Sequence, residues 1–307
     1  MTAFCHENPD GDTLGAAVAI ALAAQRLGKQ AEVVSVDGLP QAYAFLATDV
    51  MVRERPTLAP GLAVVCDAAS LERIGSVLED CRDWFAAATI ANIDHHTTNR
   101  GFGAVNVVDP GAAATCQVVV DCLAAAGVEL DQPIASALLA GLIRDSHGFS
   151  TETTTARTLA AAADAVEAGA LIEPIYRSTL VELPLPTMAL WGRLLNAMQI
   201  AAGGRIVHAT LTEEMLAATG TSQHDADGFV EFLARGSGVA IGLLFRQLAD
   251  GTRVSLRVAP GIDAASIAAE FGGGGHVRRA GCFLALPADE AVPSVVDVCE
   301  RYLTAGG

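Results

Sequence analysis

The chain has 307 residues, with 19 Lys+Arg against 35 Asp+Glu and a formal net charge of −16. This length suits about two domains, and the 51% content of hydrophobic residues, mainly small aliphatic ones, excludes a disordered chain. The acidic balance excludes a protein that binds long nucleic acid through a basic surface. Local groups or metal ions can still hold a small anion.

The cysteines and the apolar segments indicate where the protein works. Its seven cysteines include no CxxC pair, which favours buried thiols in a reducing cytosol over disulfides. Polar residues follow Cys5 directly, so no signal peptide is predicted. Apolar stretches such as residues 14–24 are shorter than the roughly 20 residues of a bilayer span. We therefore expect a soluble, cytoplasmic protein without membrane contact.

The first part of the chain alternates short strands with alanine-rich helices. The predicted elements are a helix over residues 13–28 and strands over residues 31–36, 62–66 and 89–93. Repetition of this pattern predicts an α/β domain with an open parallel sheet. Ligands of such sheets bind at the carboxyl ends of the strands, and Asp67 and Asp94 each stand one residue past a predicted strand.

The middle of the chain, residues 112–202, is predicted to be mostly helical. Helical spacing of apolar residues occurs in residues 112–126, 132–145, 154–169 and 186–200. Pro184 and Pro186 interrupt this run. The predicted organisation is a first domain at residues 1–183, a connector at 184–202 and a second domain at 203–307.

The second domain is predicted to be a smaller α/β unit. Its expected strands are residues 205–211, 239–247, 252–258 and 281–286, and its last helix is expected to end near Thr304.

The first candidate site is the sequence HENPDGD, residues 6–12, after the first predicted strand. His6, Asp10 and Asp12 lie in a loop bent by Pro and Gly, where an imidazole and two carboxylates can converge on a divalent cation. The alternative is a solvated turn in which Asp12 caps the helix beginning at Thr13.

The second candidate site is Asp94-His95-His96, directly after an apolar strand. Adjacent side chains at a strand end point in opposite directions, so we expect one histidine to bind a given metal ion. The other would contact substrate or orient its neighbour. The alternative is a pair of ordinary core or surface imidazoles.

Asp67 and Asp145, each at the end of an apolar run, are weak signals singly. Together with the two sites above they give six potential N and O ligands: His6, Asp10, Asp12, Asp67, His95 and Asp145. This number suits two divalent ions bridged by one carboxylate. Mixed imidazole and carboxylate ligands favour Mn²⁺ over Mg²⁺, and the lack of thiolates disfavours a structural zinc site.

The last candidate site contains four consecutive glycines, residues 272–275, followed by His276, Arg278 and Arg279. Glycine amides can approach an anion closely, and a helix expected to begin directly afterwards would add its positive dipole end. A flexible linker is the alternative. Six arginines and three acids lie between Arg235 and Arg279, whereas the first 150 residues hold 8 cations and 18 acids. The sequence therefore separates an acidic first half, suited to binding metal ions, from a part of the second half that is suited to binding an anion.

The order HxxxDxD, strand-end Asp, DHH, a later Asp and GGGGH resembles the DHH phosphoesterase superfamily with its DHH-associated C-terminal domain. The resemblance covers nearly the whole chain. It is strongest to the group of nanoRNases and pAp phosphatases, which includes phosphodiesterases of cyclic and linear dinucleotides. It implies an N-terminal parallel-sheet metal-binding domain, a C-terminal substrate-binding domain and an active site in the cleft between them.

The resemblance also implies a metal site with two Mn²⁺ ions, or Mg²⁺ or other divalent ions in their place. One ion would be held by His6, Asp10 and Asp67, and the second by Asp12, Asp67, His95 and Asp145. Asp94 would orient a ligand, and His96 would face the substrate phosphate. The implied catalytic residues are Asp67, Asp94, His95 and His96.

The same resemblance implies the substrate contacts. They are His96, Arg257, Gly273, Gly274, Gly275, His276 and Arg278. The segment after Asp145 departs from the family pattern, because Ser146-His147-Gly148 stands where Thr-Gly is expected. His147 is thus interpreted either as an added substrate contact or as a space-filling residue.

The expected function is Mn²⁺-dependent hydrolysis of short oligonucleotides and of linear or cyclic dinucleotides, such as pApA and cyclic di-AMP, to mononucleotides. Removal of the 3′-phosphate of pAp is expected beside it. Substrates would be short RNA or DNA rather than long nucleic acid. The resemblance to the family also implies a homodimer.

Three alternatives remain at this point. A single-strand exonuclease of the superfamily is disfavoured by 5% aromatic residues and the net charge of −16, and an inorganic pyrophosphatase by the GGGGH motif. A non-catalytic nucleotide sensor is disfavoured by the full set of ligands.

Overall fold

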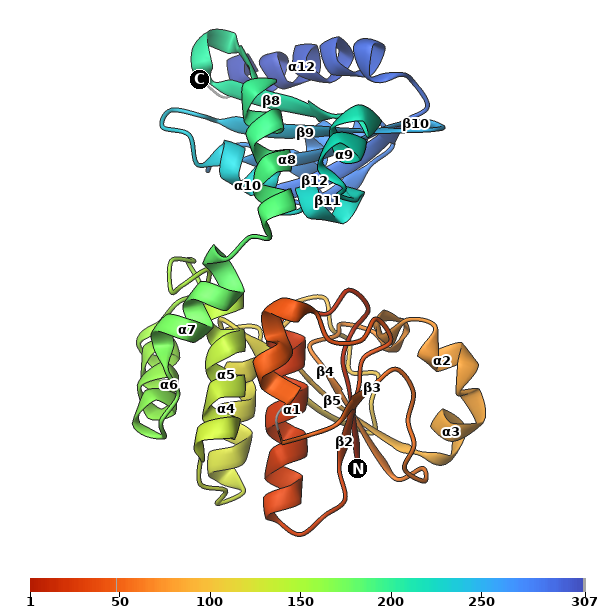
Figure 1. The fold of residues 1–307 in the computed structure, drawn as a ribbon, viewed down its shortest axis with the longest axis vertical. Helices are drawn as coiled ribbons and strands as arrows, with labels where there is room; N and C mark the ends of the chain where they lie inside the picture. The colour runs from red at the N-terminus through yellow and green to blue at the C-terminus, as the bar shows by residue number, and fades with distance from the viewer. Residues whose placement is uncertain (48, 306–307) are drawn as a thin grey trace. The chain divides into compact units, whose positions relative to one another are not determined.

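The computed structural model describes residues 1–47 and 49–305. The chain forms two compact units, one covering Met1–Glu182 and the other beginning at Leu183. Figure 1 shows that each unit contains its own sheet and helices. The segment at residues 184–202, predicted as a connector, contains helix α8 (Leu185–Asn196) and strand β7 (Gln199–Ala201), and both belong to the second unit.

The first unit is built on a six-stranded sheet with the order β3-β2-β1-β4-β5-β6, and all neighbouring strands are parallel. In chain order the strands are β1 (Thr2–Phe4), β2 (Glu32–Val34), β3 (Val52–Arg53), β4 (Leu62–Cys66), β5 (Thr89–Asp94) and β6 (Val105–Val108). The predicted parallel α/β sheet is confirmed. The sequence did not predict the edge strands β3 and β6, which are short and poorly buried.

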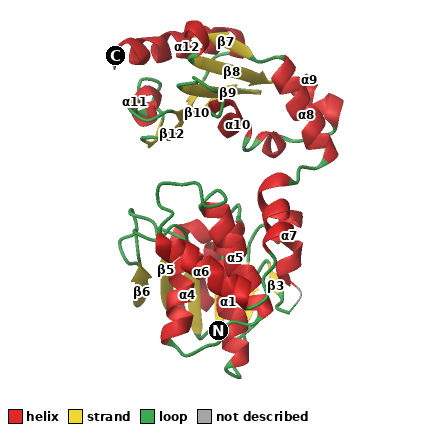
Figure 2. Cartoon of the chain, turned by 90° about the vertical axis from the view of Figure 1, so that its left-hand side faces the viewer, coloured by secondary structure: helices red, strands yellow, loops and turns green. Residues whose placement is uncertain are grey.

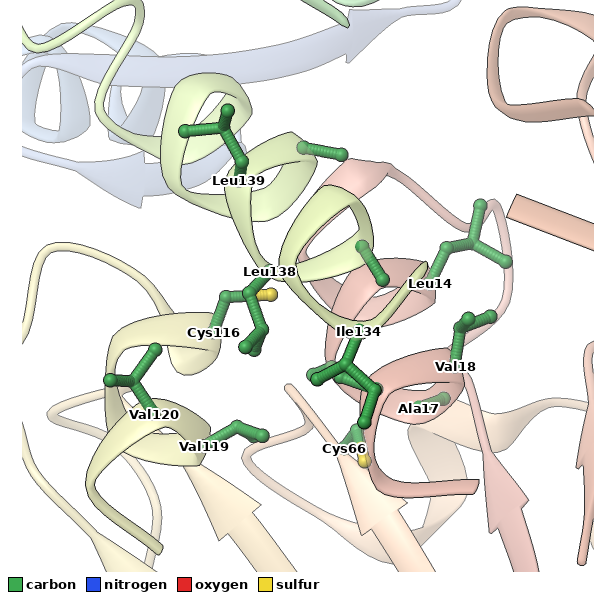
Figure 3. Packing of buried hydrophobic residues seen from close by; sticks show 14 of the residues in the cluster. Leu14, Ala17, Val18, Cys66, Cys116, Val119, Val120, Ile134, Leu138 and Leu139 are labelled. Carbon is green, nitrogen blue, oxygen red and sulfur yellow. The ribbon is translucent and has the colours of Figure 1, made fainter. Parts of the chain in front are cut away.

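Helices cover both faces of this sheet. They are α1 (Gly11–Arg26), α2 (Val77–Asp80), α3 (Arg82–Ala87), α4 (Thr115–Ala125), α5 (Gln132–Asp145), α6 (Ala156–Glu167) and α7 (Ile172–Tyr176). Figure 1 shows α1, α4 and α5 on one side of the sheet and α2 and α3 on the other. The larger core is formed by aliphatic side chains of α1, α4 and α5 packed against the sheet, as Figure 3 shows. Phe4 and Phe85 pack in a smaller core on the opposite face.

Helix α1 begins at a side-chain cap. The carboxylate of Asp10 accepts hydrogen bonds from the amides of Asp12 at 3.0 Å and Thr13 at 3.3 Å. Asp10 rather than Asp12 is therefore the capping residue. Asp12 lies within the first turn, where its side chain is free to act elsewhere, and it is fully buried.

The second unit contains a mixed six-stranded sheet with the order β11-β12-β10-β9-β8-β7, in which the pair β8–β9 is parallel and the other pairs are antiparallel. Its remaining strands are β8 (Ile206–Leu211), β9 (Ile241–Leu248), β10 (Gly251–Val258), β11 (Gly274–His276) and β12 (Arg279–Leu284). The predicted second α/β unit is confirmed, with strand ends shifted by up to two residues.

Helices also cover both faces of the second sheet. They are α9 (Glu213–Thr219), α10 (Phe229–Ala234), α11 (Ala264–Ala269) and α12 (Ala288–Ala305), in addition to α8. Side chains of α11 and α12 form a core with one face, and those of α8, α9 and α10 form a core with the other. Figure 2 shows this sheet between its helices.

The glycine run differs from its prediction, because a strand rather than a helix follows directly. Residues 274–276 form strand β11, which makes a tight antiparallel hairpin with β12 and pairs His276 with Arg279. Alternating burial along β12 explains this, since Ala280, Cys282 and Leu284 face the core while their neighbours are more exposed. Within the described residues, the helix nearest to the glycines is α11, which precedes them.

The thiols behave as the composition suggested. All seven cysteines are free, and five of them are buried. Burial raises the pKa of the Cys282 thiol to about 11 and that of Cys299 to about 12, so both remain protonated at neutral pH. Within the described residues, no helix is both long and apolar enough to cross a membrane.

Candidate metal centre

The predicted ligands gather at one edge of the first sheet. The parallel strands β1, β4 and β5 are neighbours, and their carboxyl ends lead directly to His6, Asp67 and His95. The amino-terminal end of α1 adds Asp10 and Asp12. The last residue of α5, Asp145, completes the set.

Three groups of side chains at this edge place their ligand atoms within 4.8 Å of one another. The groups are His6/Asp10/Asp67, Asp12/His95/Asp145 and Asp67/His95/His96. The first two contain all six predicted ligands, and Asp67 also belongs to the third group. Each group combines imidazole nitrogen with carboxylate oxygen, which is the donor chemistry of first-row divalent cations. The residues present therefore fit a divalent metal centre.

His6 turns one ring nitrogen toward the carboxylates. Its Nδ1 lies 2.8 Å from the carbonyl oxygen of Glu7, and its Nε2 lies 3.5 Å from Oδ2 of Asp67 and 3.8 Å from Oδ1 of Asp10. Burial lowers the pKa of His6, but the hydrogen bond and charge of Asp67, together with Asp10, outweigh burial and raise it. The ring is thus held for a cation by its bond to the main chain.

Asp67 has an unusual backbone conformation. Its φ of +59° lies in the left-handed region, which residues other than glycine adopt rarely. The amide of Asp67 donates to the carbonyl oxygen of Ile93 at 2.9 Å, so the neighbouring strand β5 holds this conformation in place. A strained residue that is fixed by its surroundings is typical of functional sites.

His95 is oriented in the same manner as His6. Its Nδ1 lies 3.1 Å from the carbonyl oxygen of Ala112, and its Nε2 lies 3.2 Å from Oδ2 of Asp145 and 3.6 Å from Oδ1 of Asp67. Burial lowers the pKa of His95, but the hydrogen bond to Asp145 and the charges of nearby carboxylates raise it to about 10. A proton occupies this imidazole at neutral pH when no cation competes for it.

Asp12 is the most buried of the four predicted ligand carboxylates. Its Oδ1 accepts from the amide of Cys116 at 2.9 Å, and its Oδ2 accepts from the amide of Thr115 at 2.6 Å. Burial raises the pKa of Asp12 well above its ordinary value, and the negative charges of Asp67 and Asp145 raise it further. A bound cation would stabilise the ionised form of such a carboxylate.

Asp94 and His96 form a hydrogen-bonded pair beside the ligands. Nδ1 of His96 donates to Oδ1 of the fully buried Asp94 at 2.7 Å, and Asn99 donates to Oδ2 at 2.6 Å. Burial raises the pKa of Asp94, but the bonds from His96 and Asn99 lower it by more. The bond to Asp94 raises the pKa of His96, whose side chain is 44% exposed.

The two adjacent histidines do not point in opposite directions as expected. Their ring centroids are 4.8 Å apart, and Nδ1 of His96 lies 3.7 Å from Oδ1 of Asp67, the oxygen that His95 also approaches. The reason is that β5 ends at Asp94, so the alternation of a strand does not apply to the residues after it.

The groups that hold the predicted ligands in place were not predicted from the sequence. The missed groups are the main chain of Ala112, Thr115 and Cys116 and the side chain of Asn99. The short polar run at residues 97–99, after the histidines, was a usable signal for Asn99. Nothing in the local sequence connects Thr115 with Asp12, which is 103 positions earlier.

The second unit brings its candidate cations into one row. Arg257 of β10 pairs with Arg279 of β12, and Arg279 pairs with His276 of β11, so the three side chains are neighbours across three strands. Nε of Arg257 donates to Oε1 of Glu231 at 2.6 Å, whereas His276 and Arg279 are exposed. Arg278 lies in the turn between β11 and β12 and is exposed as well.

Two of the glycines have a steric reason in the hairpin. A Cβ atom at Gly273 would lie 2.3 Å from the carbonyl oxygen of Gly281, and one at Gly275 would lie 2.6 Å from Cα of Ala280. A Cβ atom at Gly274 would have no neighbour within 4 Å. Gly273 and Gly275 therefore serve close strand packing, and the amide of Gly273 donates to the carbonyl oxygen of Ala268 at 2.9 Å.

Comparison with known proteins agrees with this geometry. The family profile described as "DHH family, N-terminal domain" matches residues 1–142, and the profile of the DHHA1 domain matches residues 203–305. A protein of Thermus thermophilus named bifunctional oligoribonuclease and PAP phosphatase NrnA is 32% identical, over 98% of this chain and 90% of its own length.

Solved structures show the same fold. An exopolyphosphatase-related protein of Bacteroides fragilis has a TM-score of 0.86 at 20% identity, covering 98% of this chain and 92% of its own. RecJ of Thermus thermophilus in complex with Mn²⁺ has a TM-score of 0.52 at 14% identity, covering 99% of this chain and 52% of its own. With two profiles, a full-length relative and the His/Asp groups in agreement, the chain belongs to the DHH family of phosphoesterases and carries a DHHA1 domain.

Proposed function

We propose that this phosphoesterase hydrolyses short oligoribonucleotides and linear or cyclic dinucleotides to mononucleotides, and that it removes the 3′-phosphate of pAp. The observation that carries the proposal is the convergence of six His and Asp ligands at one edge of the first sheet. The relative at 32% identity, named for oligoribonuclease and PAP phosphatase activity, supports the substrate class.

Two divalent ions fit the ligand groups, and the mixture of imidazole and carboxylate donors favours Mn²⁺. His6, Asp10 and Asp67 would hold one ion, and Asp12, Asp67, His95 and Asp145 would hold the other. Bound ions would supply Lewis acidity that activates water and neutralises charge on the phosphoryl group. Asp67, which has one oxygen toward His6 and the other toward His95, is assigned as the shared ligand.

His96 is assigned to the substrate phosphate. Asp94 accepts the Nδ1–H of His96 and raises the pKa of its imidazole, which favours the doubly protonated ring. Nε2–H is then available to donate a hydrogen bond to a phosphoryl oxygen and to stabilise the negative charge that develops there. Asn99 keeps Asp94 in position for this pairing.

The second unit is assigned to the phosphate at the end of the substrate. The row of Arg257, Arg279 and His276 offers donors for phosphate oxygens, and Arg278 in the adjacent turn adds a further cation. The amides of Gly274 and Gly275 are candidates for the same phosphate, whereas the amide of Gly273 donates to the carbonyl oxygen of Ala268. A few cations suffice for a short substrate, which agrees with a chain whose net charge is −16.

A substrate panel tests the proposal. We would measure kcat/KM of the full chain with Mn²⁺ for a short RNA oligomer, pAp, pApA, cyclic di-AMP and a long single-stranded DNA. We expect turnover of the short RNA, pAp, pApA and cyclic di-AMP, and little or no turnover of the long DNA. The ratio of kcat/KM for pApA to that for cyclic di-AMP shows whether the site prefers a free substrate end or a cyclic substrate.

Other results would contradict the proposal. Preferred hydrolysis of long DNA would support a single-strand exonuclease instead. Binding of these nucleotides without turnover, in the presence of saturating Mn²⁺, would support a nucleotide sensor.

A further inference from the structure

We infer that Thr115 is a positioning residue that fixes two ligand carboxylates, Asp12 and Asp67, at the same time. The inference deepens the proposed metal-dependent function and rests on it. Thr115 is the first residue of α4 and is fully buried. Its main-chain amide donates to Oδ2 of Asp12 at 2.6 Å, and its hydroxyl donates to Oδ1 of Asp67 at 2.8 Å.

The amino-terminal end of α4 has no cap of its own. The residue before the helix is Ala114, which has no side-chain acceptor, so the first amides of α4 need acceptors from elsewhere. Asp12 supplies them, because its two oxygens accept from the amides of Thr115 and Cys116. One carboxylate of α1 thus caps α4, and α4 in turn fixes the rotation of that carboxylate.

There is little room for Asp12 to move from this position. A Cβ atom at Gly141 of α5 would lie 2.6 Å from Oδ1 of Asp12 and 2.2 Å from Sγ of Cys116. Helix α5 therefore packs directly against the carboxylate and the helix end that holds it. The segment that leads into α4 also orients His95, because the carbonyl oxygen of Ala112 lies 3.1 Å from Nδ1 of His95.

The hydroxyl of Thr115 gives the two oxygens of Asp67 different environments. Oδ1 accepts from Thr115 and lies 3.6 Å from Nε2 of His95, whereas Oδ2 lies 3.5 Å from Nε2 of His6. Asp67 thus presents one oxygen to each of the two ligand groups that contain His6 and His95. The hydroxyl holds Asp67 in that rotation, so its removal should weaken metal binding more than it weakens folding.

The test uses Thr115→Val, which keeps the shape and the amide of the residue but removes the hydroxyl. Mn²⁺ affinity of the full chain, measured by competition with a chelator, is expected to fall about 10–100-fold for the weaker ion. Thr115→Ser retains the hydroxyl and is expected to recover most of the affinity. Thermal unfolding of the metal-free proteins shows whether each variant is folded.

A matched control is Thr252→Val in the second unit. Thr252 is also fully buried, and its hydroxyl donates to the carbonyl oxygen of Leu286 at 2.8 Å. This variant should bind Mn²⁺ as the wild type does. The inference is overturned if Thr115→Val binds both ions with wild-type affinity, or if Thr115→Ser is as weak as Thr115→Val. Wild-type protein that binds two ions but hydrolyses no panel substrate would contradict the proposed function and leave this test intact.

Discussion

The two candidate binding regions of this chain are built in opposite ways. In the first unit, four carboxylates and three imidazoles gather at the ends of buried strands, and main-chain groups hold them at Asp12, His6 and His95. In the second unit, His276, Arg278 and Arg279 are exposed on a hairpin. The groups assigned to chemistry are fixed before substrate arrives, whereas the groups assigned to binding remain adaptable.

The difference follows from electrostatics. Carboxylates that are buried together repel one another and lose hydration, so they are tolerated where a cation offsets the charge. Exposed cations keep their hydration, so a row of them costs little and can accept substrates of different shape. This contrast explains how an acidic chain can act on anionic substrates.

The largest effect is expected at the residue shared by the ligand groups. Asp67→Asn keeps the size of the side chain but removes the charge that both ions would share. We expect kcat/KM for the short RNA oligomer to fall by at least about 100-fold. Asp80→Asn, which removes an exposed carboxylate paired with Arg55, is the control and should retain full activity. Comparable activity of the Asp67 and Asp80 variants would show that the proposed metal centre is not required for hydrolysis.

Stability of the hairpin provides the second test. Gly273→Ala introduces a Cβ atom 2.3 Å from the carbonyl oxygen of Gly281, so we expect a loss of about 1–3 kcal/mol of unfolding free energy. Gly274→Ala meets no atom within 4 Å and should unfold close to wild type. Chemical denaturation of both variants measures the difference. Equal stability would show that the hairpin is looser than its strand packing indicates.

The pH dependence of metal binding sharpens the contrast between the regions. The pKa of His95 is raised to about 10 in the metal-free protein, and those of His6 and His96 are raised as well. A metal ligand must be deprotonated, so below pH 10 the ion displaces a proton from His95, and affinity rises with pH. We expect about a tenfold increase per pH unit between pH 6 and 8 for each proton released. Calorimetry in buffers of different ionisation enthalpy counts these protons, and the absence of any release would contradict the raised pKa values.

The smallest effect is expected in the adaptable region. His276→Ala removes one exposed donor, so KM for the short RNA should rise roughly 2- to 10-fold while kcat changes little. His224→Ala is the control, because that side chain is 83% exposed and pairs with Asp227 of the same unit. A large fall in kcat for the His276 variant would mean that this residue takes part in the chemical step.

Much of the fold could be predicted from local patterns. Strand β4 and helix α5 have the predicted bounds. Strand β4 is an uninterrupted apolar run, and α5 shows helical spacing of apolar residues directly after the capping residue Asp131. Ligands of parallel sheets bind at the carboxyl ends of the strands, so the positions of Asp67 and of Asp94-His95-His96 after predicted strands indicated a site. All six proposed ligands lie in the groups that the structure brings together.

The remaining features depend on contacts that are distant in sequence. Thr115 and Asp12 meet because α1 and α4 pack against the same face of the sheet, and no local signal announces that contact. The glycine run was expected to precede a helix, but pairing with β12 makes it a strand. The edge strand β6 was not predicted although three of its four residues are valine, because it is short and mostly exposed at the edge of the sheet.

We propose that the six clustered His and Asp side chains hold two divalent ions. Equilibrium dialysis of the full chain against Mn²⁺, with the metal in the protein counted by atomic spectrometry, tests it most directly. We predict two ions per wild-type chain and fewer in the Asp67→Asn variant. A wild-type chain that retains no Mn²⁺, or an Asp67→Asn variant that retains two ions as tightly as the wild type, would contradict the account.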